Sequence, residues 1–194
     1  MSFQQGVKVL HIDASGRGIE QSGSRKLSAR LVEGLKSKYG ATVVTRDIAQ
    51  GLPFVNEKMI ESYFAQGERT EEQKKAVEVS DALVKEILEA DVIVVGSPIY
   101  NFGVPAVLKA YADLIARVGI TFKYGEKGPE GLVSGKRVFT CWASGGTALG
   151  SDYDHASKWW KFFLAFLGMT DVTYVDGTKG AVEAGEKAVD ALLA

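Results

Sequence analysis

The chain of 194 residues has one cysteine and two histidines, and this scarcity argues against several classes of protein. A single cysteine, Cys141, cannot form an internal disulfide, which favours a reducing compartment and a cytoplasmic location. His11 and His155 have no second His or Cys at the spacing of metal ligands, so we expect no metal site. The chain also lacks a G-x-S-x-G elbow and a Cys/His pairing, which leaves little support for a hydrolase.

An excess of charge and long apolar runs are absent as well. The formal net charge is −1 and the pI is near 6.2, so the chain has no basic field for nucleic acid or anionic lipid. The apolar runs are strand-sized, and the polar start at 1–6 has no secretory signal, so neither a membrane span nor export is expected. The chain does have 46% hydrophobic residues, enough to bury a sizeable core. Its length predicts one domain over residues 1–194.

Strands and helices are predicted to alternate along the chain. Short β-branched and apolar runs predict five strands, at 7–12, 42–45, 92–95, 137–142 and 172–175. Apolar residues at helical spacing predict helices at 24–38, 70–90, 105–118, 159–167 and 181–193. Residues 50–69 have no clear period and are expected to form a partly helical excursion, and 119–135 is expected to be a long loop.

This alternation predicts a doubly wound α/β sandwich, in which helices cover both faces of a five-stranded parallel sheet. Rossmann-like and flavodoxin-like strand orders are both compatible with it. We favour the flavodoxin-like order 2-1-3-4-5, because its switch point lies between the loops that follow the first and third strands. Those are the two loops with the most ligand-like composition in this chain.

The loop after the third strand is the most informative segment. Tyr100 and Phe102 flank the amide of Asn101 there, just beyond the carboxyl end of a predicted strand, where open α/β sheets bind ligands. Flat apolar side chains beside a group that both donates and accepts hydrogen bonds suit a planar, polar-edged ring such as a flavin. From these residues alone, packing over the core is an equally good interpretation.

The loop after the first strand could hold a phosphate. Residues 15–24 combine three serines with three glycines immediately before a predicted helix, whose N-terminal amides and dipole favour an anion. The segment fits neither the P-loop pattern nor the usual dinucleotide fingerprint. A capped helix after a flexible loop remains the alternative.

The fourth strand is followed by Ala143-Ser144-Gly145-Gly146-Thr147. Consecutive glycines allow the backbone to approach a ligand closely and expose its N–H groups. Such donors could face the N1/C2=O edge of a flavin. A tight surface turn is the alternative interpretation.

Together, these loops resemble those of the FMN-dependent NADH:quinone oxidoreductase and azoreductase family. The resemblance covers nearly the whole chain and is most specific at Pro98-Ile-Tyr-Asn-Phe102, which is similar to the family's P-M-Y-N-F pattern. Residues 109–113, 116–124 and 128–132 follow, and the last two are similar to R-A-G-V-T-F-x-Y and G-P-x-G-L at matching spacing. The resemblance implies a flavodoxin-like homodimer with FMN at its interface.

The resemblance also implies roles for individual residues. The phosphate of FMN would be held by Ser15, Ser22, Gly23 and Ser24. The isoalloxazine would be lined by Ile99, Tyr100, Asn101 and Phe102, and by the loop Ala143, Ser144, Gly145 and Gly146. Tyr124 would lie above the flavin, and Phe166 would lie near a substrate pocket, where it could reach the partner subunit.

The implied activity passes two electrons from NADH or NADPH through bound FMN to a quinone or an aromatic azo compound, in ping-pong order. Two departures leave the substrate range and the nicotinamide preference open: Ala143-Ser144 replaces the family's frequent Ser-Arg, and the first loop is longer than in many relatives. A flavodoxin-type electron carrier is disfavoured by the near-zero charge and by the extra segment 119–135. A cofactor-free receiver module is disfavoured because no Asp follows the third strand to accompany Asp13.

Overall fold

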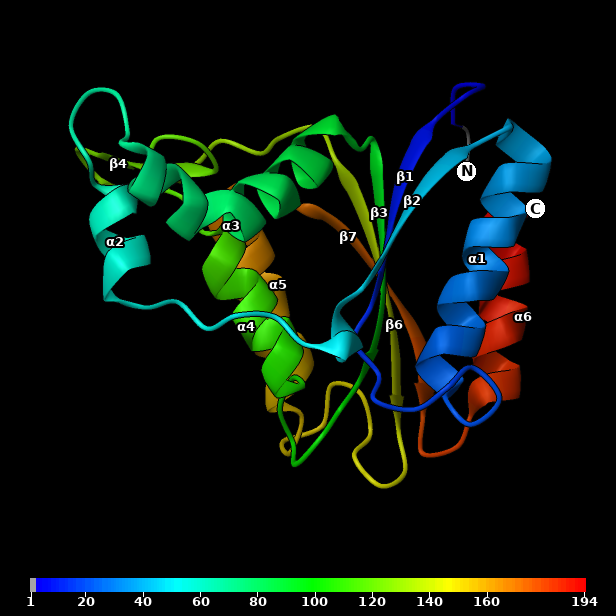
Figure 1. Cartoon of the computed structure of the whole chain (residues 1–194). Coiled ribbons are helices and arrows are strands. Elements are labelled where there is room, and N and C mark those ends of the chain that lie inside the picture. Colours follow the sequence, from blue (N-terminus) through cyan, green and yellow to red (C-terminus); the bar gives the residue numbers. More distant parts are fainter. Residues whose placement is uncertain (1–2) are drawn as a thin grey trace.

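A central sheet of five parallel strands organises the structure, a computed structural model that describes residues 3–194 (Figure 1). The strands lie in the order β2-β1-β3-β6-β7. Their bounds are β1 Lys8–Asp13, β2 Thr42–Asp47, β3 Val92–Pro98, β6 Arg137–Ser144 and β7 Asp171–Thr178. Every residue of the central strand β3 is buried, as its continuous apolar run predicts for a parallel strand covered on both faces.

Helices cover both faces of the sheet, as Figure 1 shows. On one face lie α1 (Gly23–Tyr39) and α6 (Val182–Leu193). On the other lie α3 (Glu71–Glu89), α4 (Ala106–Ile115) and α5 (His155–Leu167). Side chains of a strand alternate between faces, so Val94 joins the core beneath α1 whereas Ile93 and Val95 join the core beneath the other three helices.

The predicted α/β fold, with five parallel strands and helices on both faces, is confirmed, but the predicted numbering 2-1-3-4-5 is wrong. Two further strands, β4 (Phe122–Gly125) and β5 (Gly128–Gly131), pair antiparallel outside the main sheet, so its order by chain position is 2-1-3-6-7. The predicted long loop at 119–135 is therefore a hairpin. Its strands are short and rich in glycine, which removes the alternating pattern that marks a strand.

The remaining elements lie close to the segments predicted for them. The excursion contains the 3₁₀ turn η1 (Ile48–Gln50) and the helix α2 (Glu57–Tyr63). A capping box starts α3, since Gln73 N donates to Thr70 Oγ1 at 3.2 Å and Thr70 N donates to Gln73 Oε1 at 3.0 Å. Helix α5 begins one turn earlier than the predicted start at 159.

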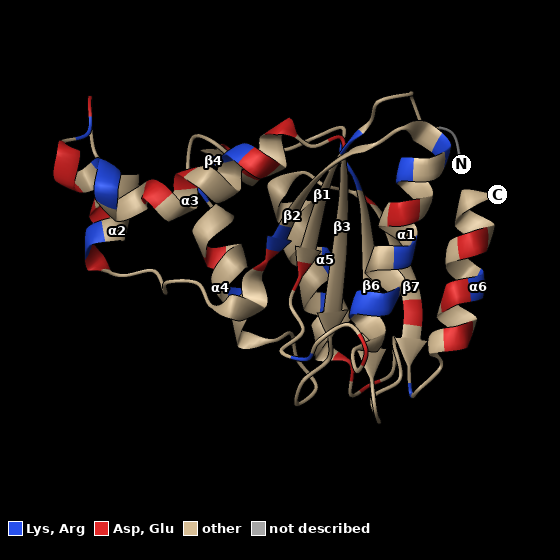
Figure 2. Cartoon of the chain, turned by 45° about the vertical axis from the view of Figure 1, so that its right-hand side comes forward, with Lys and Arg blue, Asp and Glu red and all other residues tan. Residues whose placement is uncertain are grey.

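The surface carries charges of both signs. Figure 2 shows Lys and Arg interspersed with Asp and Glu on the outer faces of α1, α3 and α6, in keeping with a net charge of −1. None of the helices formed by residues 3–194 is long and apolar enough to cross a membrane.

Candidate cofactor site

The loops at the carboxyl ends of the parallel strands converge at one edge of the sheet, at the bottom of Figure 1. Two adjoining cavities lie there, and both are lined by Ile99, Ser144 and Gly145. The first, which we call the serine cavity, measures ≈ 440 Å³ and reaches the start of α1. The second, the aromatic cavity, measures ≈ 630 Å³ and reaches the start of α5.

Each of the twelve residues that the resemblance assigns to the phosphate or to the lining of the isoalloxazine lines one of these cavities. The serine cavity takes Ser15, Ser22, Gly23, Ser24, Tyr100 and Ala143 besides the shared residues. The aromatic cavity takes Asn101, Phe102 and Gly146. The structure therefore brings together three loops that are far apart in the sequence.

Hydroxyls and amides concentrate at the start of α1. Ser22 caps the helix, because its Oγ accepts a hydrogen bond from Arg25 N at 3.3 Å. The same Oγ lies 3.2 Å from the Oγ of Ser24, which is fully buried. No acidic residue lies in the first turn of this helix, so no carboxylate there competes with a bound anion for the positive end of the helix dipole. The adjacent Gly23 is closely packed, because a Cβ there would lie 2.7 Å from Val182 Cγ2 and 3.3 Å from Ala143 Cβ. The arrangement is suited to an anion.

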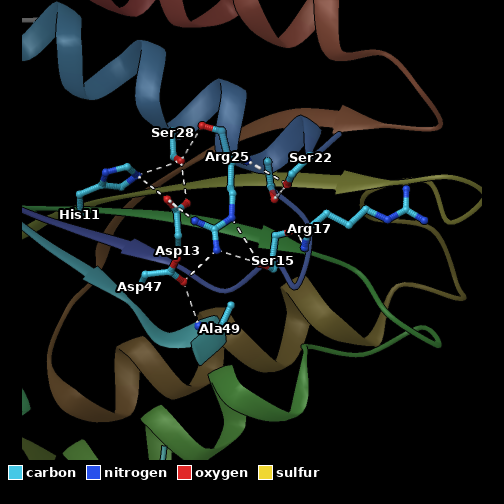
Figure 3. A network of polar contacts seen from close by, with 10 residues as sticks. His11, Asp13, Ser15, Arg17, Ser22, Arg25, Ser28, Asp47 and Ala49 are labelled. Atoms are coloured by element: carbon cyan, nitrogen blue, oxygen red, sulfur yellow. Dashed lines mark hydrogen bonds and ion pairs between the residues drawn. The ribbon is translucent and has the colours of Figure 1, made fainter. Parts of the chain in front are cut away.

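A guanidinium clamp holds the loop that leads into this helix (Figure 3). Arg25 donates to the carbonyl oxygen of Ser15 through Nε at 3.2 Å and through Nη2 at 2.8 Å. It also contacts Asp13 Oδ2 at 3.3 Å and Asp47 Oδ1 at 2.8 Å. Burial opposes the charge of Arg25, but Asp47 and Asp13 outweigh it and raise the pKa of the guanidinium. The loop after β1 is thus fixed to the end of β2 as well as to α1.

Beneath the clamp, the polar side chains form a buried chain across α1 and β1. Ser28 Oγ donates to Asp13 Oδ1 at 3.1 Å, and His11 Nε2 lies 2.9 Å from the same hydroxyl. Gly96 on β3 leaves room for this pair, since a Cβ there would lie 2.5 Å from Asp13 Oδ1 and 2.6 Å from Ser28 Oγ. Asp13 and His11 are accordingly scaffold residues of the serine cavity.

The loop after β3 is a tight turn with an unusual backbone. Tyr100 and Gly103 exchange two backbone hydrogen bonds of 3.0 Å, and the two residues between them have positive φ, 48° at Asn101 and 70° at Phe102. This conformation is costly for Phe, which lacks the freedom of Gly. The carbonyl of Phe102 accepts from His155 N at 3.0 Å, which ties the turn to the start of α5.

The loop after β6 presents bare backbone. A Cβ at Gly145 or Gly146 would have no neighbouring atom within 4 Å, so both glycines face open space. The base of the loop is fixed, because Ile99 N donates to the carbonyl of Ala143 at 2.8 Å. Peptide groups in this loop can therefore approach a flat ligand closely.

Several residues that line the cavities were not predicted from the sequence as individual cofactor contacts: Arg17, Gln21, Thr147, Ser151, Tyr153 and Lys179. The loop around Lys179 follows the last parallel strand, and the rule that ligands bind beyond carboxyl ends of strands could have identified it. Arg25 could not have been found in this way, because its partners come from separate strands.

Tyr124 and Phe166 line neither cavity. They belong to an aromatic cluster around Phe122, whose ring centroid lies 5.5 Å from that of Tyr124 and 4.6 Å from that of Phe166. Tyr124 is 70% exposed. Within one chain, the structure does not bring these two residues to the loops predicted to bind the cofactor.

Cys141 is fully buried in β6, and burial, with the negative charge of Asp13, raises the pKa of its thiol. It is therefore a packing residue with no reactive thiolate. No group of three or more His, Cys, Asp or Glu that could hold a metal ion occurs within residues 3–194.

The model of a family described as having a flavodoxin-like fold matches residues 7–194. The FMN-dependent NADH:quinone oxidoreductase of Erythrobacter litoralis (strain HTCC2594) is 45% identical over 186 residues, which are 93% of this chain and 92% of that protein. The chain belongs to the FMN-dependent NADH:quinone oxidoreductase family. A homologue from Jannaschia sp. (strain CCS1) with the same name is 45% identical over 90% of each chain.

Solved structures of family members have the same architecture. An azoreductase from Bacillus anthracis str. Sterne is 32% identical, with a TM-score of 0.87 over 96% of this chain and 98% of that one. An FMN-dependent NADH-azoreductase from Bacillus anthracis str. Ames Ancestor, solved in complex with FMN, is 26% identical, with a TM-score of 0.83 over 97% of this chain and 100% of that one. The resemblance inferred from the loop sequences is confirmed.

Proposed function

We propose that this chain is an FMN-dependent oxidoreductase, in which residues 1–194 form one domain and two electrons pass from NADH or NADPH to quinones and aromatic azo compounds. The relatives named above act as quinone oxidoreductases and azoreductases, which supports an enzyme over an electron carrier. The observation that carries the proposal is the buried Ser22–Ser24 pair at the start of α1, which opens into the serine cavity.

The residues of the two cavities fit FMN. The serine hydroxyls and the N-terminal amides of α1 provide donors for a phosphate, and no Asp or Glu from residues 3–194 lines the serine cavity. The bare peptide groups of Gly145 and Gly146 and the amide of Asn101 provide partners for a polar-edged ring. The cavities adjoin, so one elongated molecule can occupy both.

When bound, FMN supplies the redox chemistry, accepting two electrons from the nicotinamide and yielding them to the acceptor. The protein positions the ring and the substrates, and it stabilises charge on the ring. With FMN bound, the backbone N–H groups at 144–146 would stabilise negative charge on a polar edge of the ring. Tyr100 and Phe102 frame the ring and exclude water, which positions donor and acceptor in turn. Two backbone hydrogen bonds close the turn at 100–103 and fix the backbone from which these side chains project.

We propose further that two copies form a homodimer with FMN at its interface, in the cytoplasm. Tyr124 and Phe166 would then complete the acceptor pocket of the partner subunit rather than that of their own chain. Support comes from the outward-facing aromatic rings near them, since Tyr124 is 70% exposed and Phe162 is 74% exposed. Exposed aromatic surface of this kind is typical of protein interfaces.

Titration of apoprotein with FMN tests the assignment of the phosphate site. Replacing Ser22 and Ser24 together by Ala should weaken FMN binding by about 2 kcal/mol, the scale of hydrogen bonds to a charged group. Riboflavin, which lacks the phosphate, should bind both proteins alike. Ser37→Ala provides the matched control, because this serine is exposed at the far end of the same helix. An unchanged FMN dissociation constant in the double variant would rule out the proposed phosphate site.

A further inference from the structure

Lys179 lies on a loop that is hydrogen-bonded to neighbouring loops of the cofactor site. It follows β7 directly and lines the aromatic cavity. The loop is fixed on both sides of it, because Gly180 N donates to the carbonyl of Ser144 at 3.3 Å and Leu149 N donates to Thr178 Oγ1 at 3.1 Å. Lys179 is thus held beside the residues proposed to contact the flavin ring.

The backbone of Lys179 is strained. Its φ is 54°, in the left-handed region that favours Gly, Asn or Asp over Lys. Gly180, with φ of 76°, follows it, so the turn already uses one glycine. Backbone strain of this kind recurs at functional sites, where the function of the side chain explains why a strained residue is kept at that position.

The charge of Lys179 is uncompensated. Among residues 3–194, no Asp or Glu lines the aromatic cavity, and Lys179 takes part in no ion pair or side-chain hydrogen bond. Lys179 is the one Lys or Arg that these residues contribute to the wall of this cavity. An uncompensated cation beside a cavity attracts an anionic ligand.

An aromatic pair forms another part of the same wall. The rings of Phe102 and Tyr153 lie with centroids 5.9 Å apart, and they are 53% and 69% exposed as whole residues. Exposed rings of this kind provide a stacking surface for a planar aromatic molecule. The cavity therefore combines a surface for an aromatic ring with a positive charge for an anionic substituent.

We propose that Lys179 selects aromatic acceptors that carry a sulfonate or carboxylate group over neutral acceptors with the same ring. This inference rests on the proposed function and names the substrate class that the site prefers. The ring stacks on Phe102 and Tyr153 while the anionic group pairs with the ammonium of Lys179. Because the pair is accessible to solvent, the preference weakens with added salt.

The test compares 1,4-naphthoquinone with 1,4-naphthoquinone-2-sulfonate as acceptors, using the FMN-loaded enzyme. The measured quantity is the ratio of kcat/KM for the sulfonate to kcat/KM for the neutral quinone. The two acceptors differ in reduction potential, but that difference is the same for every variant, so a change in the ratio reports the protein. Lys179→Met should lower the ratio about fivefold, mainly through KM for the sulfonate.

Two control variants isolate the position of the charge. Lys179→Arg should keep the ratio of the wild type, because it keeps the cation. Lys187→Met removes an exposed charge on α6 and should leave the ratio unchanged. Raising the salt concentration to about 0.5 M should reduce the ratio of the wild type toward that of Lys179→Met.

Equilibrium binding gives a readout that needs no turnover. Naphthalene-2-sulfonate should perturb the flavin absorbance of the wild type at lower concentration than of Lys179→Met, while neutral 2-naphthol should bind both equally. Equal ratios and equal binding in wild type and Lys179→Met would overturn the inference, as would an equal loss with both quinones. If the wild type reduces neither quinone, the proposed function fails, and the binding comparison still decides the role of Lys179.

Discussion

At the residue scale, the site combines a backbone held at positive φ with buried polar side chains that have partners. Phe102 adopts a positive φ, Ser24 buries its hydroxyl completely, and Arg25 is enclosed by two carboxylates. The sequence predicted the residue types at 15–24 and 99–102, because hydroxyls and aromatic rings are visible there. It could not predict the positive φ of an Asn-Phe pair, since nothing in that dipeptide requires it, or the partners of Arg25, which come from separate strands.

Phe102 offers a test of stored strain. Phe102→Gly should leave the free energy of unfolding unchanged or raise it by about 1 kcal/mol, because Gly adopts the φ of 70° without cost. A buried Phe cut back to Ala would instead lose about 3–5 kcal/mol. The same variant should impair acceptor reduction, since the ring that frames the flavin is gone. Chemical denaturation and steady-state rates measure the two effects, and a clear loss of stability would show that the ring serves packing instead.

At the element scale, strands and helices that bury a regular apolar pattern were predictable, and elements held by tertiary contact were not. The hairpin β4–β5 contains little pattern of its own. It packs at the end of α5, where a Cβ at Gly131 would lie 2.1 Å from Gly168 N. The first turn of α5 was missed for a related reason: its start is set by a cap at Asp154, whereas its large apolar residues begin five positions later, at Trp159.

The cap of α5 gives a pH-dependent prediction. Asp154 is fully buried, and its carboxylate accepts from Ser157 N at 2.9 Å and from Gly150 N at 2.8 Å. Burial opposes its ionisation, but these hydrogen bonds and that from the hydroxyl of Ser157 outweigh burial and hold the pKa below its usual range. Its contribution to stability is therefore complete above the unfolded pKa of about 3.9 and is lost as the pH falls through the lower folded value.

Asp154→Asn should accordingly lower the free energy of unfolding by about 1–2 kcal/mol at pH 7. The difference from the wild type should shrink as the pH falls below about 4, because the wild-type carboxyl becomes protonated. Urea denaturation at a series of pH values measures this. Asp152→Asn, at an exposed neighbouring position, should leave the free energy of unfolding at pH 7 within about 0.5 kcal/mol of the wild type. A difference that stays constant down to pH 3 would contradict the account of the cap.

At the scale of the whole molecule, the doubly wound order brings the loops after β1, β3, β6 and β7 to one edge of the sheet. Alternation of strands and helices was sufficient to predict this convergence, and with it the three predicted loops. The sequence of one chain does not specify which residues contribute to the site of a second copy. The separation of Tyr124 and Phe166 from both cavities is explained if they belong to the site of a partner subunit.

Phe162 tests the proposed homodimer. It is 74% exposed on α5, so Phe162→Lys should cost the folded chain little while placing a charge in the interface. Light scattering at assay concentration should give twice the 20.9 kDa of one chain for the wild type and a lower mass for the variant. Val44→Lys alters an exposed apolar residue on the edge strand β2 and should remain dimeric. A wild type that is monomeric would contradict the interface.

The central claim is that one protein-bound flavin takes electrons from NADH and gives them to a quinone. The most direct measurement follows the absorbance of the bound flavin at about 450 nm, without oxygen, as the two substrates are added in turn. The account predicts that one equivalent of NADH bleaches the band and that one equivalent of quinone, added after the oxidised nicotinamide is removed, restores it fully. A band that NADH does not bleach, or that quinone does not restore, would contradict the account.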